Sequence, residues 1–176
     1  DPTSDYGAML PFGFFDPLNL TPPDIQNFRK YRESEIKHGR LAMLGATGFF
    51  FGEKFGFLFG NVIHGPALTQ YSQAEGILNG FSYNVIGLAL AVEGWNIVKG
   101  WQDDSVEGNI EVGIGALKSA EEYDLGDLDW DPLNLMPDQE GPSRVMRQKE
   151  LSNGRLAMLG AAGMIAQELV TGSKVF

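Results

Sequence analysis

The sequence predicts an all-α membrane protein with three transmembrane helices, in which the first and third are related and the middle one is unique. Three observations support this fold class. Apolar stretches of about 20 residues at 41–60, 81–101 and 151–171 are each long enough to cross a bilayer core. The first and third stretches belong to an internal duplication. If the stretches cross a membrane in alternating directions, eleven of the thirteen basic residues fall on one side.

The duplication is visible in the octet GRLAMLGA, which occupies 39–46 and recurs at 154–161, 115 residues later. The match extends without a gap, so that 19 of the 41 positions in 16–56 are identical in 131–171. The sequence DPLNL begins each copy. An internal repeat of this length predicts two similar helices, related by a pseudo-twofold axis and crossing each other.

Local sequence signals indicate where the predicted helices begin. An Asp-Pro turn with two leucines opens each copy, and prolines mark the entry to a polar, basic helical segment that leads into the octet. We expect the first helix at about 24–58, the unique middle helix at about 81–101 and the third at about 143–171, all in a single domain at 1–176. The segment 61–80 is expected to be a loop.

The charge distribution predicts the orientation. The N-terminus and the loop at 102–143 lie on the cytoplasm-equivalent side, and the C-terminus and the 61–80 loop lie on the other. Trp95 and Trp101 fall near one end of the middle stretch, as interfacial anchors do. The net charge of −10 argues against a nucleic-acid partner, and the absence of cysteine excludes disulfides and thiolate metal sites.

Charged residues interrupt all three stretches, so a soluble helical bundle is the alternative on hydropathy alone. Inside a membrane, such charges need partners. Glu35 and Arg40 diverge on one helix by about 140°, so they face each other poorly. If the two related helices cross at their octets, Glu35 pairs with Arg155 and Glu150 pairs with Arg40, while the glycines and alanines allow a close approach.

Further polar groups lie beside these predicted pairs. His38 follows Glu35 by three residues, and Asn153 follows Glu150 by three, so each pair shares a helix face. Gln167 and Glu93 are isolated in apolar surroundings. A Mg²⁺ ion already held by four ring nitrogens needs one more donor, and imidazole, carboxamide or carboxylate groups all serve.

The paired segments RESEIKHGRLAMLG and RQKELSNGRLAMLG, each preceded by DPLNL, and the AVEGW of the middle stretch resemble the light-harvesting chlorophyll-binding superfamily. The resemblance covers 16–172. It implies chlorophyll magnesium ligands at Glu35, His38, Glu93, Glu150, Asn153 and Gln167, with Arg40 and Arg155 as ion-pair partners of the ligand glutamates. It also implies that two carotenoids place their polar ends at Asp16, Pro17, Leu18, Asp131, Pro132 and Leu133.

The sequence departs from the land-plant pattern in two places. Val85 stands where a glutamine is usual, which leaves the neighbouring Asn84 as a weak ligand candidate, and no amphipathic helix follows Thr171. Both departures resemble the chlorophyll a/c antennae of red-lineage algae, of the fucoxanthin or peridinin type. His64 is a further weak ligand candidate.

The resemblance implies an antenna without catalytic residues, which binds chlorophyll a, chlorophyll c and a carotenoid such as fucoxanthin, and no metal beyond chlorophyll magnesium. It would lie in the chloroplast thylakoid membrane, among thylakoid lipids, with its N-terminus in the stroma. Its expected partners are neighbouring antenna proteins and a photosystem core, with photosystem I as the first choice. A photoprotective, quenching relative is one alternative. A di-iron carboxylate bundle is another, since Glu-x-x-His is also a di-iron spacing.

Overall fold

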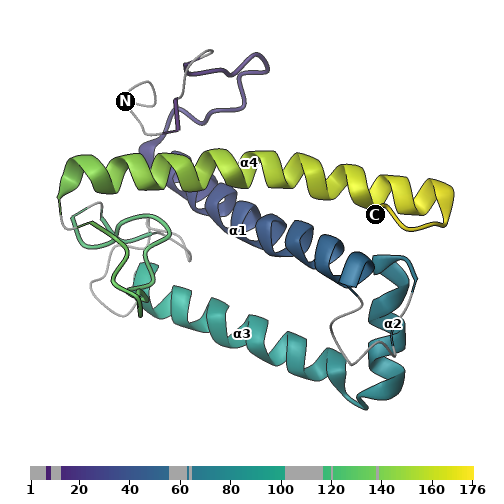
Figure 1. Ribbon diagram of the computed structural model, residues 1–176. Helices are drawn as coiled ribbons and strands as arrows, with labels where there is room; N and C mark the ends of the chain where they lie inside the picture. The colour runs from purple at the N-terminus through teal and green to yellow at the C-terminus, as the bar shows by residue number, and fades with distance from the viewer. Residues whose placement is uncertain are drawn as a thin grey trace. The chain divides into compact units, whose positions relative to one another are not determined.

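A computed structural model describes residues 7–8, 13–55, 63, 65–101, 117–119, 121–137 and 139–176. They form four helices, which are α1 at Ile25–Phe55, α2 at Ala67–Ile77, α3 at Phe81–Gly100 and α4 at Glu140–Thr171 (Figure 1). In these ranges there is no β-strand, and one isolated bridge joins Trp101 to Leu117. The predicted all-α class is confirmed for the described chain.

The helices differ from the expected three in number. α1, α3 and α4 lie within a few residues of the predicted helices, but α2 lies in the segment 61–80 that was expected to be a loop. Its sequence ALTQYSQAEGI is short and lacks a sustained apolar stripe, so periodicity gives little signal there. In the part of the chain that the structure describes, no helix combines the length and the apolar character that crossing a membrane requires. The three predicted transmembrane spans are therefore not confirmed.

Local chemistry explains where the two long helices begin. The side chain of Asp24, directly before α1, accepts a hydrogen bond from the Asn27 N–H at 3.1 Å, as an N-cap residue does. Pro142 lies in the first turn of α4, where a missing N–H leaves no helical hydrogen bond unmade. The prolines that predicted the helix entries therefore stand at or just before them.

The chain divides into two compact units. The first comprises Asp1–Lys37 and Leu90–Leu151, and the second comprises His38–Ala89 and Ser152–Phe176. The first unit thus holds the beginning of α1 and of α4 and the end of α3. The second holds the remainder of those helices and the whole of α2.

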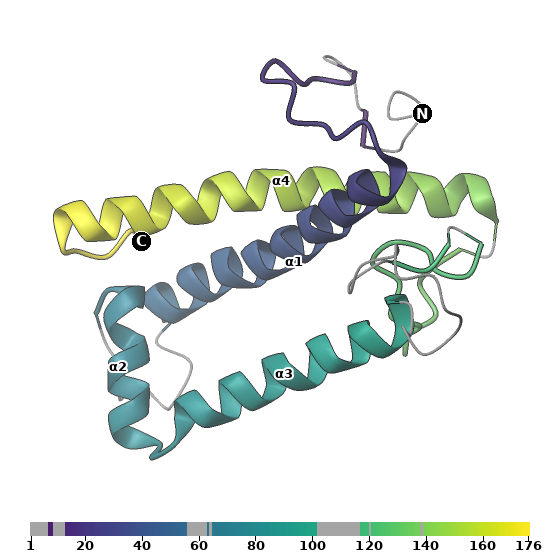
Figure 2. The same ribbon diagram turned by 180° about the vertical axis from the view of Figure 1, so that it is seen from behind.

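In the second unit, α2 connects the end of α1 to the beginning of α3 and is tied to both (Figure 2). Gln70 of α2 donates a hydrogen bond to the Gly52 carbonyl of α1 at 3.2 Å. Glu75 of α2 accepts from the backbone N–H and the hydroxyl of Ser82 at 2.7 and 2.6 Å. These polar contacts with the two neighbouring helices hold a helix whose own sequence is a weak helix signal.

Candidate functional site

The two DPLNL segments form the same turn. Asp16 accepts hydrogen bonds from the Leu20 and Thr21 N–H groups at 3.0 and 2.8 Å, and Asp131 accepts one from the Met136 N–H at 2.7 Å. Asn19 and Asn134 both have a φ of 50°, the left-handed conformation that asparagine tolerates. The duplication therefore extends from sequence to backbone structure.

These turns present their leucines to the outside. The exposed fractions of Leu18 and Leu133 are 74% and 75%, so this leucine is equally exposed in both copies. Their aspartates stay ionised. A hydrogen bond from the Thr21 side chain, followed by backbone N–H groups, lowers the pKa of Asp16, and the Met136 N–H is the main cause that lowers the pKa of Asp131. Each turn thus combines an anchored carboxylate with an exposed apolar side chain.

The two octets meet at their first glycines. A Cβ atom added to Gly39 would lie 3.0 Å from the Cα of Gly154, and one added to Gly154 would lie 3.0 Å from the Cα of Gly39. In the second unit, α1 and α4 therefore approach each other backbone to backbone at this point (Figures 1 and 2). Only glycine allows this approach without displacing the partner helix.

The glycines further along the two helices have more space around them. A Cβ added at Gly45, Gly48, Gly160 or Gly163 would meet nothing within 4 Å in the described chain. Close approach of the two backbones is thus shown at Gly39 and Gly154, and not at the glycines further along the helices. The reason is geometric, because two straight helices that cross touch at one point and then diverge.

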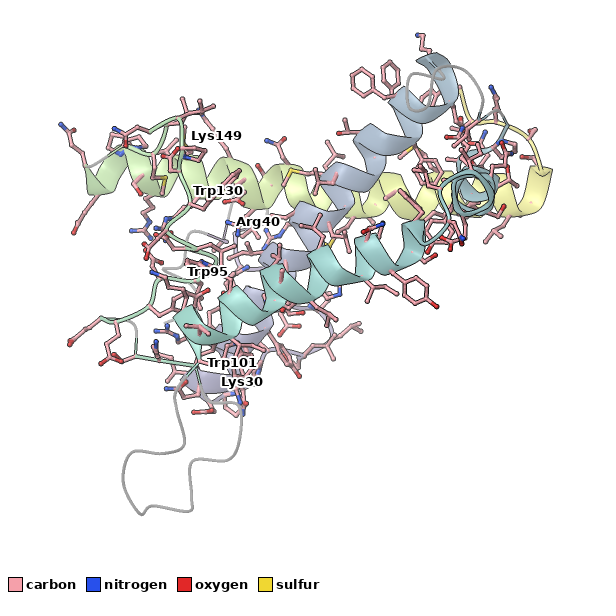
Figure 3. All side chains as sticks on the ribbon, turned by 90° about the horizontal axis from the view of Figure 1, so that it is seen from below. Lys30, Arg40, Trp95, Trp101, Trp130 and Lys149 are labelled. Atoms are coloured by element: carbon pink, nitrogen blue, oxygen red, sulfur yellow. The ribbon has the colours of Figure 1, made fainter. Side chains whose placement is uncertain are left out.

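The predicted magnesium ligands lie on three helices. Glu35 contacts the Arg32 guanidinium one turn earlier in α1, in the first unit. His38 on α1 and Asn153 and Gln167 on α4 are exposed, and Glu150 on α4 is half-buried. Arg40, on α1 (Figure 3), and Arg155, on α4, are half-buried. The predicted pairs Glu35–Arg155 and Glu150–Arg40 each join residues assigned to different units, and they stay predictions.

Glu93 on α3 has a partner that sequence reasoning missed. The Lys37 Nζ atom of α1 lies 2.8 Å from Glu93 Oε2, within the first unit. One turn further along α3, the Asn96 Nδ2 atom donates to Glu33 Oε1 of α1 at 3.0 Å. Glu33 and Lys37 share a face of α1, and Glu93 and Asn96 share a face of α3, but spacing within a helix does not show which other helix that face meets.

Glu33 is the centre of a buried polar cluster in the first unit. Its carboxylate also accepts hydrogen bonds from the Tyr123 hydroxyl at 3.0 Å and the Gly126 N–H at 2.8 Å. Arg29 donates to the Tyr123 carbonyl at 2.8 Å. Burial, followed by the negative charge of Glu33, raises the pKa of Tyr123 to about 12. This cluster ties α1 and α3 to the loop at 121–137.

The tryptophans lie around the same end of α3. Trp95 lies near the end of α3, Trp101 directly follows that helix, and Trp130 comes from the loop at 121–137 (Figure 3). The Trp95 Nε1 atom donates to the Leu128 carbonyl at 3.1 Å, which joins helix and loop. The side chain of Trp130 is 81% exposed. Trp95 thus serves a hydrogen bond within the protein in addition to the anchoring role predicted for it.

The weak ligand candidates have less support. The Asn84 amide donates to the Gly80 carbonyl at 3.0 Å, an ordinary bond at a helix start. His64 lies outside the described residues. Among those that the structure describes, no group of three or more histidine, aspartate or glutamate side chains is placed to hold a metal ion.

Sequence reasoning also missed that two carboxylates at equivalent repeat positions contact each other. Glu53 of α1 and Glu168 of α4 occupy equivalent repeat positions, are both buried, and hydrogen-bond to each other in the second unit. Glu168 accepts from the Ala67 and Leu68 N–H groups at 2.7 and 2.9 Å, so it caps the start of α2. Glu53 also accepts the Ala67 N–H, at 3.1 Å. The repeat predicted that these two positions are alike but not that they meet.

Large apolar side chains are exposed along all three long helices. The most exposed, each at least 66% accessible, are Ile25, Leu41, Leu44, Tyr83, Leu88, Leu90, Val98, Leu156, Leu159, Leu169 and Val170. Helical spacing places Leu41 on the same face of α1 as His38, three residues earlier. It likewise places Leu156 on the same face of α4 as Asn153. Bare apolar surface of this extent marks a site that other molecules cover. A flat apolar pigment with one coordinatively unsaturated metal ion fits a donor side chain that is surrounded by leucines and glycines.

Comparison with known proteins places the chain among pigment-binding proteins. The family described as chlorophyll A-B binding protein matches residues 2–169. A fucoxanthin-chlorophyll a-c binding protein of Isochrysis galbana is 42% identical over 91% of this chain and 74% of its own length. The light-harvesting complex stress-related protein 3.2 of Chlamydomonas reinhardtii is 39% identical over 97% of this chain. The alignment covers 64% of that relative's length.

Proposed function

Because the chain belongs to the chlorophyll A-B binding protein family, within the light-harvesting superfamily, we propose that it binds chlorophylls and carotenoids and passes absorbed energy to a photosystem core. The observation that carries this proposal is the set of helix faces on which donor side chains stand among exposed leucines and open glycines. Bound pigments supply the absorption and the energy transfer, and the chain fixes their positions and surroundings. No catalytic residue is part of this role.

The proposed magnesium ligands are Glu35, His38, Glu93, Glu150, Asn153 and Gln167. Chlorophyll a, chlorophyll c and a xanthophyll such as fucoxanthin are the proposed pigments, which the similarity to a fucoxanthin-chlorophyll a-c binding protein supports. The two DPLNL turns are proposed to receive carotenoid ends, since both hold an anchored aspartate beside an exposed leucine. Arg40 and Arg155 are proposed to neutralise the ligand glutamates of the opposite repeat.

We further propose that α1, α3 and α4 lie in the thylakoid membrane with the N-terminus in the stroma, next to other antenna proteins and photosystem subunits. The one-sided distribution of basic residues and the exposed apolar side chains support this placement. Labelling of single engineered cysteines from each side of sealed thylakoids tests it. A cysteine at position 27 that reacts only from the lumen would contradict the stromal N-terminus.

Reconstitution tests the ligands one at a time. His38→Ala is expected to lose about one chlorophyll per polypeptide, since an axial donor is removed while the helix is kept. Ser34→Ala, which changes an exposed residue one turn earlier in α1, is the matched control. Retention of every chlorophyll by His38→Ala would remove that residue from the ligand set.

A photoprotective role is the second candidate, because the chain is 39% identical to a stress-related light-harvesting protein over nearly its whole length. In that case the bound pigments dissipate energy when the lumen acidifies. Fluorescence lifetime of the pigmented protein, measured in detergent as the pH falls from 7.5 to 5, separates the two roles. A tenfold change in the ratio of a harvesting to a dissipating state corresponds to about 1.4 kcal/mol. A shortened lifetime supports dissipation, and a constant lifetime supports harvesting alone.

A further inference from the structure

Lys37 and Glu93 form an ion pair between helices that the proposed pigment ligands do not account for. The Lys37 Nζ atom of α1 lies 2.8 Å from Glu93 Oε2 of α3, and both residues belong to the first unit. The side chain of Lys37 is 28% exposed and that of Glu93 is 54% exposed. Lys37 therefore points inward toward α3, whereas the carboxylate remains accessible to a ligand.

No other cation of α3 serves Glu93 in the described chain. The residue one turn further on is Asn96, which is neutral and donates its amide to Glu33. Lys99, the basic residue near the end of α3, is paired with Asp129. The positive charge that Glu93 needs thus comes from α1.

The ion pair and a second polar contact fix how α1 lies along α3 in the first unit. Glu33 contacts Asn96 and Lys37 contacts Glu93, so the order of the partners reverses and the helices run antiparallel. The first contact is buried, at 3% exposure for both residues, and the second lies next to it. Glu93 is therefore held at a defined position on α3 by a side chain from a different helix.

We propose that Lys37 is the positioning residue and counter-charge that make Glu93 a chlorophyll magnesium ligand. This inference rests on the proposed function. The Lys37 ammonium binds Oε2, and Oε1 accepts no hydrogen bond from the described residues, so that oxygen is available to a metal. The carboxylate adds a negative charge in apolar surroundings, and an adjacent ammonium group cancels it.

The test is reconstitution with chlorophylls a and c and carotenoids, followed by extraction and counting of chlorophyll per polypeptide. Lys37→Gln is expected to lose about one chlorophyll, because without the ammonium group the site must hold a net negative charge in apolar surroundings. Lys99→Gln is the matched control, since it breaks an ion pair of α3, the helix that carries Glu93, without involving Glu93 itself. It is expected to retain the full complement.

Two further variants separate charge compensation from a merely structural ion pair. Lys37→Arg keeps the charge and is expected to retain every chlorophyll. In Lys37→Gln/Glu93→Gln the ligand is a neutral amide that needs no counter-charge, so the lost chlorophyll is expected to return. A purely structural ion pair predicts no such recovery. Failure of the double variant to recover would overturn the proposal, even if Lys37→Gln alone does not assemble.

Failure of the inference can be told apart from failure of the proposed function. A wild-type chain that takes up no chlorophyll contradicts both. If Glu93→Ala retains every chlorophyll, Glu93 is not a ligand, and the inference falls while pigment binding stands. If Glu93→Ala loses about one chlorophyll but Lys37→Gln loses none, Glu93 ligates without help from Lys37, and the inference alone is wrong.

Discussion

Three groups donate hydrogen bonds to the buried carboxylate of Glu33, namely the Asn96 amide, the Tyr123 hydroxyl and the Gly126 N–H. A buried carboxylate with this many donors holds several chain segments in one arrangement, because each unpaired donor would cost about 1–3 kcal/mol. Glu33 thereby holds α1 in the orientation in which Lys37 faces Glu93. The stability of the first unit and the placement of a proposed ligand therefore depend on the same residue.

The first prediction concerns Tyr123, whose pKa is raised to about 12 by burial and by the charge of Glu33. Glu33→Gln is expected to lower this pKa while leaving it above the ordinary value of 10, since burial is the larger cause. Phenolate absorbance during an alkaline titration, with Tyr123→Phe as the blank, measures it. The raised pKa stabilises the fold fully below about 10, and this contribution is lost as the pH rises through about 12. An unchanged pKa in Glu33→Gln would contradict the contact.

Sequence reasoning did not single out Glu33 or Lys37. Their repeat counterparts are Gln148 and Ser152, so the duplication gave no reason to treat them as special. Their partners lie 56 to 93 positions away in the chain, where local spacing carries no information. In contrast, Asp16 and Asp131 bind backbone groups four or five residues further on, and the repeated DPLNL marked both turns.

At the scale of elements, the crossing of α1 and α4 depends on two glycines. Gly39→Ala is expected to destabilise the second unit by about 1–3 kcal/mol, because the new methyl group would lie 3.0 Å from the Gly154 backbone. Gly45→Ala is the matched control in the same helix, where a methyl group meets open space, and it should be neutral or stabilising by up to about 1 kcal/mol. Thermal unfolding followed by circular dichroism compares the two. Equal melting temperatures would contradict the close approach.

The start of α2 depends on a carboxylate from α4. Glu168→Ala removes the acceptor of the Leu68 N–H and one of the two acceptors of the Ala67 N–H, and loss of such a cap costs about 0.5–2 kcal/mol. Amide hydrogen exchange in the peptide covering 67–77 should therefore accelerate by about 2- to 30-fold. Glu121→Ala, an exposed loop change, should leave that exchange rate as in the wild type. Unaltered exchange in Glu168→Ala would mean that α2 holds its first turn without the carboxylate.

The pH dependence of the second DPLNL turn follows from Asp131. Its pKa lies below the ordinary 3.8, mainly because the ionised carboxylate accepts the Met136 N–H. The turn is therefore stabilised above pH 3.8, and this contribution disappears as the pH falls through the lowered value. Exchange of the Met136 amide, corrected for its intrinsic pH dependence, should rise at that point. Asp131→Asn should abolish the transition, and a transition that persists in this variant would assign it to another group.

At the scale of the whole chain, the all-α class and three of the four helices could be predicted because the duplicated segment and the apolar stretches are long and periodic. The three predicted membrane spans are not confirmed. α2 could not be predicted, because contacts from α1, α3 and α4 stabilise it rather than its own pattern. Repeat spacing shows which positions are alike but not how far two helices remain in contact, so it did not single out Gly39 and Gly154 among the small residues. The ligand set was carried over from a resemblance, and pigment counting is what decides it.

The central claim is that this chain is a scaffold for chlorophylls and carotenoids. The most direct measurement is reconstitution of the purified chain with a mixture of chlorophylls a and c and carotenoids, followed by pigment extraction, chromatography and iron analysis. A fixed ratio of several chlorophylls and at least one carotenoid per polypeptide, without iron, is the predicted result. A chain that carries stoichiometric iron and no chlorophyll would contradict it.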